Sequence, residues 1–441
     1  MIAPSVKLTG LRKIVKEKIL FDNEPTPELL AILTVYFVQG ILGLARLAVT
    51  FFLKDSLGLN PAEVATITGI TFLPWIVKPI YGFISDGFPI FGYRRRPYII
   101  ASGILGFISW LVLAFIVDDV FIAVVALLMT SLSVAISDVI VDSLVVERAR
   151  EESVAQAGSL QALCWGFSAF GGLITAYLSG WLIEIFGING VFEITATFPL
   201  LVSLVAWLIV EEKSDIDNIE GRKALITTQT KQLWSAIRQK SIYLPVAFLF
   251  IWQATPTAES AFFFFTTNEL GFEPEFLGRV RLVTSVASLV GVFIFQTYLK
   301  DVPFRKIFGW SIVISTLLGL TNLLLVTHTN RIIGIDDRLF SLGDSLILTV
   351  MGQISWLPIL VLCARLCPKG VEATLFALLM SIWNLSLFVS SQISAVLTAW
   401  LAVTEVNFEN LWLLVTITNL STLIPLPFLG WLPKGDPQKE S

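Results

Sequence analysis

The chain alternates between long apolar segments and short polar connections. An α-helix needs about 20 mostly apolar residues to cross ~30 Å of hydrocarbon, and the apolar segments reach that length. The predicted fold is therefore all-α: a polytopic membrane protein whose twelve transmembrane helices form two six-helix bundles. The predicted spans are 29–53, 61–84, 97–117, 120–146, 154–183, 188–210, 242–266, 275–299, 304–327, 340–364, 370–401 and 408–432.

A hydrophilic segment at 211–241 divides these spans into two groups of six. The predicted order is an N-terminal segment (1–28), a first bundle (29–210), a linker (211–241), a second bundle (242–432) and a tail (433–441). In the N-terminal segment, apolar residues share one helical face and lysines surround it. Such a pattern is typical of an amphipathic helix lying on an anionic membrane surface.

Basic residues are distributed unevenly between the two sides of the predicted membrane. Of the 30 Lys and Arg residues, 23 fall in connections on one side and 3 on the other. Positive charge accumulates on the cytosolic side of membrane proteins. We therefore expect the N-terminal segment, the linker and the tail in the cytosol. We expect a multi-pass monomer embedded in lipid, most simply in a plasma (inner) membrane.

Composition excludes several other classes of protein. Of 441 residues, 55% are apolar and 15% are charged, whereas soluble domains have about 25% charged residues. The net charge of −4 gives no sign of a nucleic-acid partner. Three cysteines and a single histidine, His328, form neither a disulfide framework nor a metal-binding pattern. We expect no cofactor and no enzymatic activity.

A glycine-rich and charged motif connects the second and third predicted spans. It reads Gly82-Phe-Ile-Ser-Asp86, followed by Gly92-Tyr-Arg-Arg-Arg-Pro97. The carboxylate can pair with arginines or with a helix N-terminus, and the arginines can bind anionic lipid. The motif resembles the cytosolic loop motif of the major facilitator superfamily, lengthened here by residues 87–91. We expect Asp86 to help close a cytosolic gate; for the arginines, fixing the topology is the alternative role.

Three longer segments carry a more specific resemblance: 74–98, 137–150 and 368–384. In these the chain resembles the folate–biopterin transporter family, a cyanobacterial and plastid-type branch of the major facilitator superfamily. The resemblance implies a secondary transporter that moves folates, pterins or related heterocyclic anions by alternating access. It also implies that a proton gradient supplies the energy.

Two other functions stay open at this point. One is a major facilitator carrier or exporter of another amphipathic small solute. The other is an intramembrane enzyme, although the sequence offers no convergent set of nucleophile, base and metal ligands.

Polar residues inside predicted spans are costly in hydrocarbon and therefore mark candidate sites. Arg46 lies on a polar stripe of the first span that also contains Tyr36 and Gln39. Thr255-Pro256 predicts a kink in the seventh span, and Glu259, which follows it, is the candidate partner of Arg46. Arg281 is a candidate for holding a substrate anion. Amides and tryptophans at matching places in spans 5 and 11 can bind a flat heterocycle. The predicted substrate-binding residues are Gln39, Arg46, Gln161, Trp165, Glu259, Arg281 and Asn384.

A second group of charged residues lies toward the cytosolic side. Asp138 and Asp142 are four residues apart on one helical face, where two carboxylates repel unless they are paired or partly protonated. Lys78, between two prolines that interrupt the second span, and Arg148 are candidate partners. This arrangement suits proton coupling or a cytosolic gate. The predicted residues for these roles are Lys78, Asp86, Asp138, Asp142 and Arg148.

Overall fold

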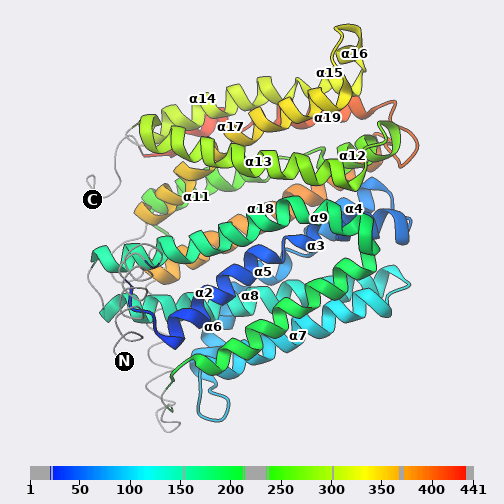
Figure 1. Ribbon diagram of the computed structural model, residues 1–441. Helices are drawn as coiled ribbons and strands as arrows, with labels where there is room; N and C mark the ends of the chain where they lie inside the picture. Colours follow the sequence, from blue (N-terminus) through cyan, green and yellow to red (C-terminus); the bar gives the residue numbers. More distant parts are fainter. Residues whose placement is uncertain are drawn as a thin grey trace, which may run out of the picture. The chain divides into compact units, whose positions relative to one another are not determined.

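In the computed structural model the chain is almost entirely helical (Figure 1). The structure describes residues 20, 23–151, 154–211, 213, 235, 238–299, 302–366 and 372–433. Most of the N-terminal segment, most of the linker and nearly all of the tail lie outside these ranges, so the predictions made for them stay predictions. Within the described residues, the β-structure is one isolated bridge between Ile90 and Tyr93.

The predicted spans correspond to helices or to pairs of shorter helices. The first half of the chain contains α2 (Pro27–Ile41), α3 (Leu44–Phe51), α4 (Pro61–Ile70), α5 (Leu73–Ile76), α6 (Lys78–Gly87), α7 (Arg96–Phe115), α8 (Val120–Glu151) and α9 (Val154–Val205). The second half contains α11 (Lys240–Gln253), α12 (Glu259–Phe264), α13 (Pro274–Ile294), α14 (Phe304–Gly319), α15 (Asn322–Val326), α16 (Thr329–Ile332), α17 (Asp337–Leu366), α18 (Glu372–Trp400) and α19 (Leu411–Ser421). Short π-helical turns extend α3, α12 and α13.

Ten helical segments of the described chain are long and apolar enough to span a membrane. Two local features account for the difference from twelve. Gly187 turns the chain between the fifth and sixth predicted spans with φ 68° and ψ 177°, a conformation available essentially only to glycine. Helix adjoins this kink on both sides, so one segment contains both predicted spans. The seventh predicted span is divided, because α11 ends at Gln253 and α12 begins at Glu259. Each part is then shorter than a full span.

Contacts between residues group the chain into two compact units, which we call unit 1 (1–48 and 80–220) and unit 2 (49–79 and 221–441). In unit 2, α4 packs against α18, and the Gln392 amide Nε2 donates to the Thr66 carbonyl oxygen at 3.2 Å. The end of the first span and much of the second therefore contact helices from the other half of the sequence. The bundle bounds 29–210 and 242–432 stay predictions.

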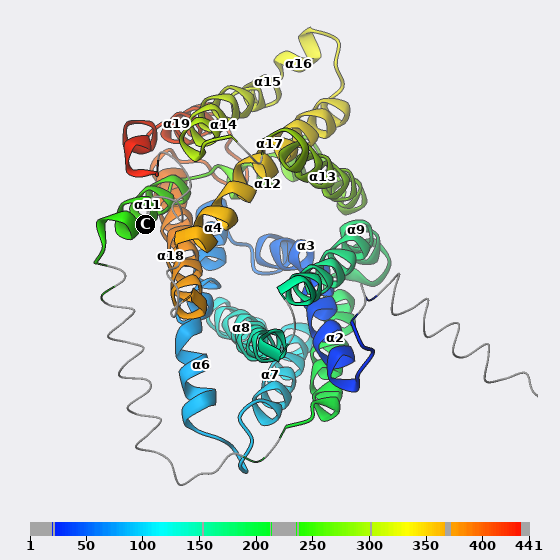
Figure 2. The same ribbon diagram turned by 90° about the vertical axis from the view of Figure 1, so that its left-hand side faces the viewer.

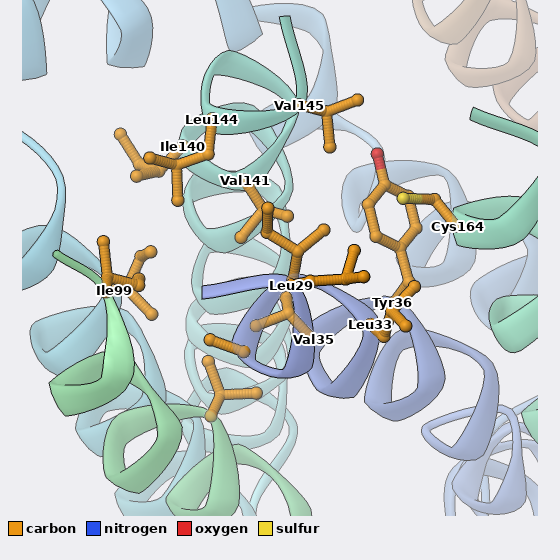
Figure 3. Packing of buried hydrophobic residues seen from close by; sticks show 14 of the residues in the cluster. Leu29, Leu33, Val35, Tyr36, Ile99, Ile140, Val141, Leu144, Val145 and Cys164 are labelled. Atoms are coloured by element: carbon orange, nitrogen blue, oxygen red, sulfur yellow. The ribbon is translucent and has the colours of Figure 1, made fainter. Parts of the chain in front are cut away.

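The core of unit 1 forms where α2 packs against α8 and α9, and where α7 packs against α8 and α9. Buried apolar side chains such as Leu29, Ile99 and Ile140 fill the space between these helices (Figure 3). Two buried serines hydrogen-bond across helices, because Ser133 Oγ donates to the Ser102 carbonyl at 2.6 Å and Ser203 Oγ donates to the Ile100 carbonyl at 2.8 Å. Such hydrogen bonds help to associate membrane helices, because apolar side chains alone give little preference for one helix partner.

The contact between α2 and α9 depends on glycines that leave no room for a side chain. A Cβ added to Gly40 would lie 2.0 Å from the Ser168 carbonyl oxygen, and one added to Gly171 would lie 2.5 Å from the Phe37 carbonyl oxygen. Small residues permit this backbone approach, which is how many membrane helices associate. The crossing of α2 over α9 is thus fixed by the sequence at these two positions.

We expect Gly40→Ala to lower the free energy of unfolding by about 1–3 kcal/mol, because the methyl group has to push two backbones apart. Gly166→Ala is the matched control. Gly166 is also on α9, but a Cβ there meets nothing within 4 Å, so helix propensity should stabilise that variant by about 0.5–1 kcal/mol. Thermal unfolding in detergent measures both. Equal melting temperatures for the two variants would contradict the close-packing interpretation.

Candidate functional site

Arg95 is the centre of a charge network between the end of α6 and the start of α7. Its Nη1 lies 2.8 Å from Asp86 Oδ1, and its Nη2 lies 2.7 Å from Glu147 Oε1 on α8. The Arg95 side chain is 7% exposed, whereas the two carboxylates are about half exposed. Burial lowers the pKa of Arg95, but the two carboxylates outweigh burial and raise the pKa above its ordinary value. The guanidinium therefore stays charged.

Glu211, just after the sixth predicted span, caps the N-terminus of α7. Its carboxylate accepts hydrogen bonds from the backbone N–H groups of Arg94, Arg95 and Arg96 at 2.5–3.1 Å. The Arg96 Nη2 also donates to the Ile209 carbonyl at 2.6 Å. A carboxylate at this position satisfies N–H groups that have no partner within the helix. The network consequently ties the ends of α6, α7, α8 and the sixth span together.

A second polar cluster lies inside unit 1, among α2, α8 and α9. Tyr36 Oη donates a hydrogen bond to Asp142 Oδ1. Tyr36 is buried, and in Figure 3 its ring lies beside Cys164. The Trp165 ring, which is 61% exposed, is 6.5 Å from the Tyr36 ring between centroids. A titratable carboxylate is thus connected through a single tyrosine to an accessible aromatic surface.

The break between α11 and α12 places polar groups inside unit 2. The sequence predicts a kink at Thr255-Pro256, and the structure has non-helical backbone from there to Ala258. Ser390 Oγ of α18 donates to the Thr255 carbonyl at 2.7 Å, and the Thr257 N–H donates to Ser394 Oγ at 2.8 Å. Broken helices are tolerated at membrane depth where other protein groups satisfy the freed backbone, and in transporters they often mark binding sites.

Other predicted substrate-binding residues are placed as follows. Arg46 on α3 and Glu259 at the start of α12 are both exposed, but they belong to different units, so their pairing stays a prediction. Arg281 on α13 is half-buried. Asn384 donates to the Met380 carbonyl of its own helix at 2.9 Å. The side chain of Gln161 lies outside the described residues.

Gln39 on α2 is half-buried. Its side chain lines a small cavity of about 10 Å³ enclosed by α2, α7, α8 and α9, together with Ser133 and Ser137. Its Nε2 is buried, with no hydrogen-bond partner among the described residues. A cavity of this size holds about one water molecule, so a packing role competes with the predicted substrate contact.

The remaining gating candidates are partly placed. Asp138 on α8 is half-buried. Arg148 Nη1 donates to Thr26 Oγ1, the N-cap of α2, at 2.9 Å. Lys78 lies where α5 ends and α6 begins, as the two flanking prolines predict, and its ammonium is 5.0 Å from the centroid of the Trp75 ring.

Sequence reasoning missed several members of these clusters. Glu147 and Glu211 are not among the predicted site residues, although each is an acid near the predicted cytosolic end of a span. Tyr36 lies on the polar stripe of the first span but is not among the predicted site residues. Asp344 on α17 accepts a hydrogen bond from Thr321, and the signal that could have found it is an acid inside the predicted span 340–364.

Solved structures show which fold the chain has. The fold matches that of a D-xylose–proton symporter (TM-score 0.66, 14% identity, covering 92% of this chain and 98% of that one). It matches the nucleoside transporter NupG to the same degree (TM-score 0.66, 12% identity, covering 91% and 98%). The chain therefore has the fold of a major facilitator transporter.

Sequence comparison defines the family. Residues 39–441 match the BT1 family, and the chain belongs to that family. It is 61% identical over 430 residues to a folate-biopterin transporter of Synechocystis, covering 98% of this chain and 86% of that protein. It is 34% identical to a probable folate-biopterin transporter of Arabidopsis thaliana (covering 90% and 81%). It is 30% identical to folate transporter 1 of Plasmodium falciparum (covering 99% and 86%). The predicted family resemblance is thus confirmed.

We expect Asp86→Asn and Glu147→Gln each to cost about 1 kcal/mol, because Arg95 keeps one carboxylate in either variant. The double variant should lose more than the sum of the two, by about 0.5–3 kcal/mol, since a buried guanidinium then has no charged partner in the network. Asp118→Asn, at an exposed acid, is the control and should leave stability unchanged. Melting temperatures of the wild type, the two single variants and the double variant measure the coupling between the two carboxylates. Strictly additive effects would exclude this coupling.

Proposed function

We propose that this protein moves folates, pterins or related heterocyclic anions across a membrane by alternating access. The observation that carries the substrate class is the near full-length similarity to the Synechocystis protein, whose name states folate and biopterin transport. The polar clusters buried in the spans agree with a substrate path. A carrier of another amphipathic solute is the alternative, and substrate competition would distinguish the two.

The proposed substrate contacts follow from the chemistry of folate, a flat pterin joined to a glutamate with two carboxylates. The exposed indole of Trp165 offers a stacking surface for the pterin. Arg46 and Arg281 are the proposed cations for the carboxylates, because a guanidinium binds a carboxylate through two parallel hydrogen bonds. Arg281→Lys should then weaken competition by folate more than competition by a pterin without glutamate.

The proposed energy source is a proton gradient, with no bound cofactor. Asp138 and Asp142 are the candidate proton carriers, and Asp142 is favoured because Tyr36 connects it to Trp165. Protonation of Asp142 removes the charge to which Tyr36 donates, so the hydrogen bond and with it one polar link between α2 and α8 weaken. Through this step, proton binding changes the surroundings of the proposed substrate surface.

The proposed gates lie in two places. Near the predicted cytosolic side, the Arg95 network ties helix ends together within unit 1. In unit 2, α4 meets α18 at Gly69, where a Cβ would lie 2.5 Å from the Gln392 Nε2 atom. Alternating access requires α4 and α18 to separate in the opposite state.

The test of the function is uptake of labelled folate into vesicles that contain the purified protein. We expect accumulation above the equilibrium level when a pH gradient is imposed, and only equilibration without one. Vesicles lacking the protein are the control. Failure of pterins and folates to bind or to enter, with the protein correctly folded, would reject the substrate assignment.

Asp142→Asn tests the proton step in the same vesicles. The variant should lose accumulation driven by the pH gradient but keep exchange of labelled for unlabelled folate, because exchange needs no net proton movement. Asp138→Asn is the matched comparison on the same helix face. Equal loss of accumulation and exchange in Asp142→Asn would indicate a structural role instead.

The proposed orientation places both termini and the linker in the cytosol, and the proposed location is a plasma (inner) membrane. Single cysteines at Lys213 and Ile332, both exposed, report on the two sides in a background without native cysteines. A membrane-impermeant maleimide added to intact cells should label Ile332→Cys and leave Lys213→Cys unlabelled. The reverse pattern would overturn the orientation.

A further inference from the structure

The connection between α6 and α7 presents apolar side chains to its surroundings. Phe88 is 71% exposed, and Phe91 is 88% exposed, the highest value among the large apolar side chains that the structure describes. With Ile90 they form what we call the Phe88–Phe91 turn, within the insertion that lengthens the loop motif. Figure 2 shows this connection projecting past the ends of both helices. A contiguous exposed apolar group of this kind marks an interaction surface.

The turn is rigidly held rather than loosely exposed. Ile90 and Tyr93 exchange two backbone hydrogen bonds, at 2.9 and 3.0 Å, and Tyr98 Oη of α7 donates to the Phe88 carbonyl at 2.6 Å. Phe91 and Gly92 occupy the two central positions with φ of 55° and 86°, as a tight hairpin turn requires.

Phe91 is an unfavourable residue for its position. Left-handed backbone suits glycine, asparagine and aspartate, whereas a bulky side chain there is strained. Because the Phe91 ring is exposed, its contacts within the chain offset little of this backbone strain. A strained and exposed phenylalanine therefore points to a stabilising environment outside the protein.

The position of the turn and the charges beside it indicate which environment this is. The adjoining segments 61–87 and 96–115 are both long and apolar enough to span a membrane, so their connection lies at the membrane–water boundary. Arg94 follows the turn, and the exposed Lys213 lies with its ammonium 6.0 Å from the centroid of the Tyr93 ring. Aromatic and basic residues together are typical of segments that enter the headgroup region of a membrane.

We propose that the Phe88–Phe91 turn inserts into the interfacial layer of the lipid bilayer, with Arg94 and Lys213 meeting anionic headgroups. The turn then anchors the α6–α7 edge of unit 1 to the membrane surface. The proposal does not depend on which solute the protein carries.

The test uses an environment-sensitive fluorophore on Phe88→Cys or on Phe91→Cys, in a background without native cysteines. The labelled protein is placed in vesicles of phosphatidylcholine and phosphatidylglycerol, with or without lipids that carry a nitroxide near the headgroup. We expect at least twofold stronger quenching by the nitroxide lipid at both positions than at Glu409→Cys, an exposed control in the connection between α18 and α19. If the nitroxide lipid quenches the label no more strongly than it quenches the control, the proposal is wrong. Iodide, a water-soluble quencher, then tells whether the turn lies in water, where iodide reaches the label, or against a protein partner, which shields it.

A second pair of variants tests the role of the Phe91 side chain itself. Phe91→Asn keeps a residue that tolerates left-handed backbone but removes the apolar ring, so it should weaken nitroxide quenching of a label at position 88. Phe121→Asn, at a phenylalanine that is 76% exposed at the start of α8, is the matched control and should leave that quenching unchanged. Unchanged quenching in Phe91→Asn would show that its ring does not anchor the turn.

Discussion

Close contact between helix backbones is the constraint on which the other features depend. Lipid tails are as apolar as leucine, so burial of apolar side chains gives little preference for one helix partner over another. Glycines provide that preference: Gly40 and Gly171 join α2 to α9, and Gly291 packs on Val350 of α17. Where no Cβ fits, the rotation of each helix is fixed. That rotation decides which polar residues meet inside each unit.

Several polar groups within each unit are held by specific partners. The backbone freed at the break between α11 and α12 is bound by Ser390 and Ser394, one turn apart on α18. In unit 1, Tyr36 binds Asp142, and Arg95 is shared between two carboxylates. An unpartnered polar group in hydrocarbon costs several kcal/mol. Each cluster is therefore stable as arranged, and changing the charge of one member alters the whole cluster.

This property suits a transporter, in which a chemical event has to change the preferred packing of helices. Because Tyr36 is on α2 and Asp142 on α8, neutralising a single carboxylate weakens a link between two helices. The Arg95 network links further helix ends, and its two carboxylates are about half exposed, so solvent and lipid headgroups compete for them. Links of this strength can hold one state without preventing exchange with another.

The sequence by itself determined the all-helical membrane fold, the approximate bounds of the spans, the break at Thr255-Pro256 and the family. These depend on local quantities: the length of apolar runs, the positions of prolines, and motifs such as Gly82–Asp86. Only the tertiary structure decided that Glu211 caps α7, that Tyr36 donates a hydrogen bond to Asp142, and that α4 packs on α18. Such contacts join residues as many as 326 positions apart. Sequence periodicity fixes the face of a helix on which a residue lies, but the partner on that face depends on how closely the backbones approach.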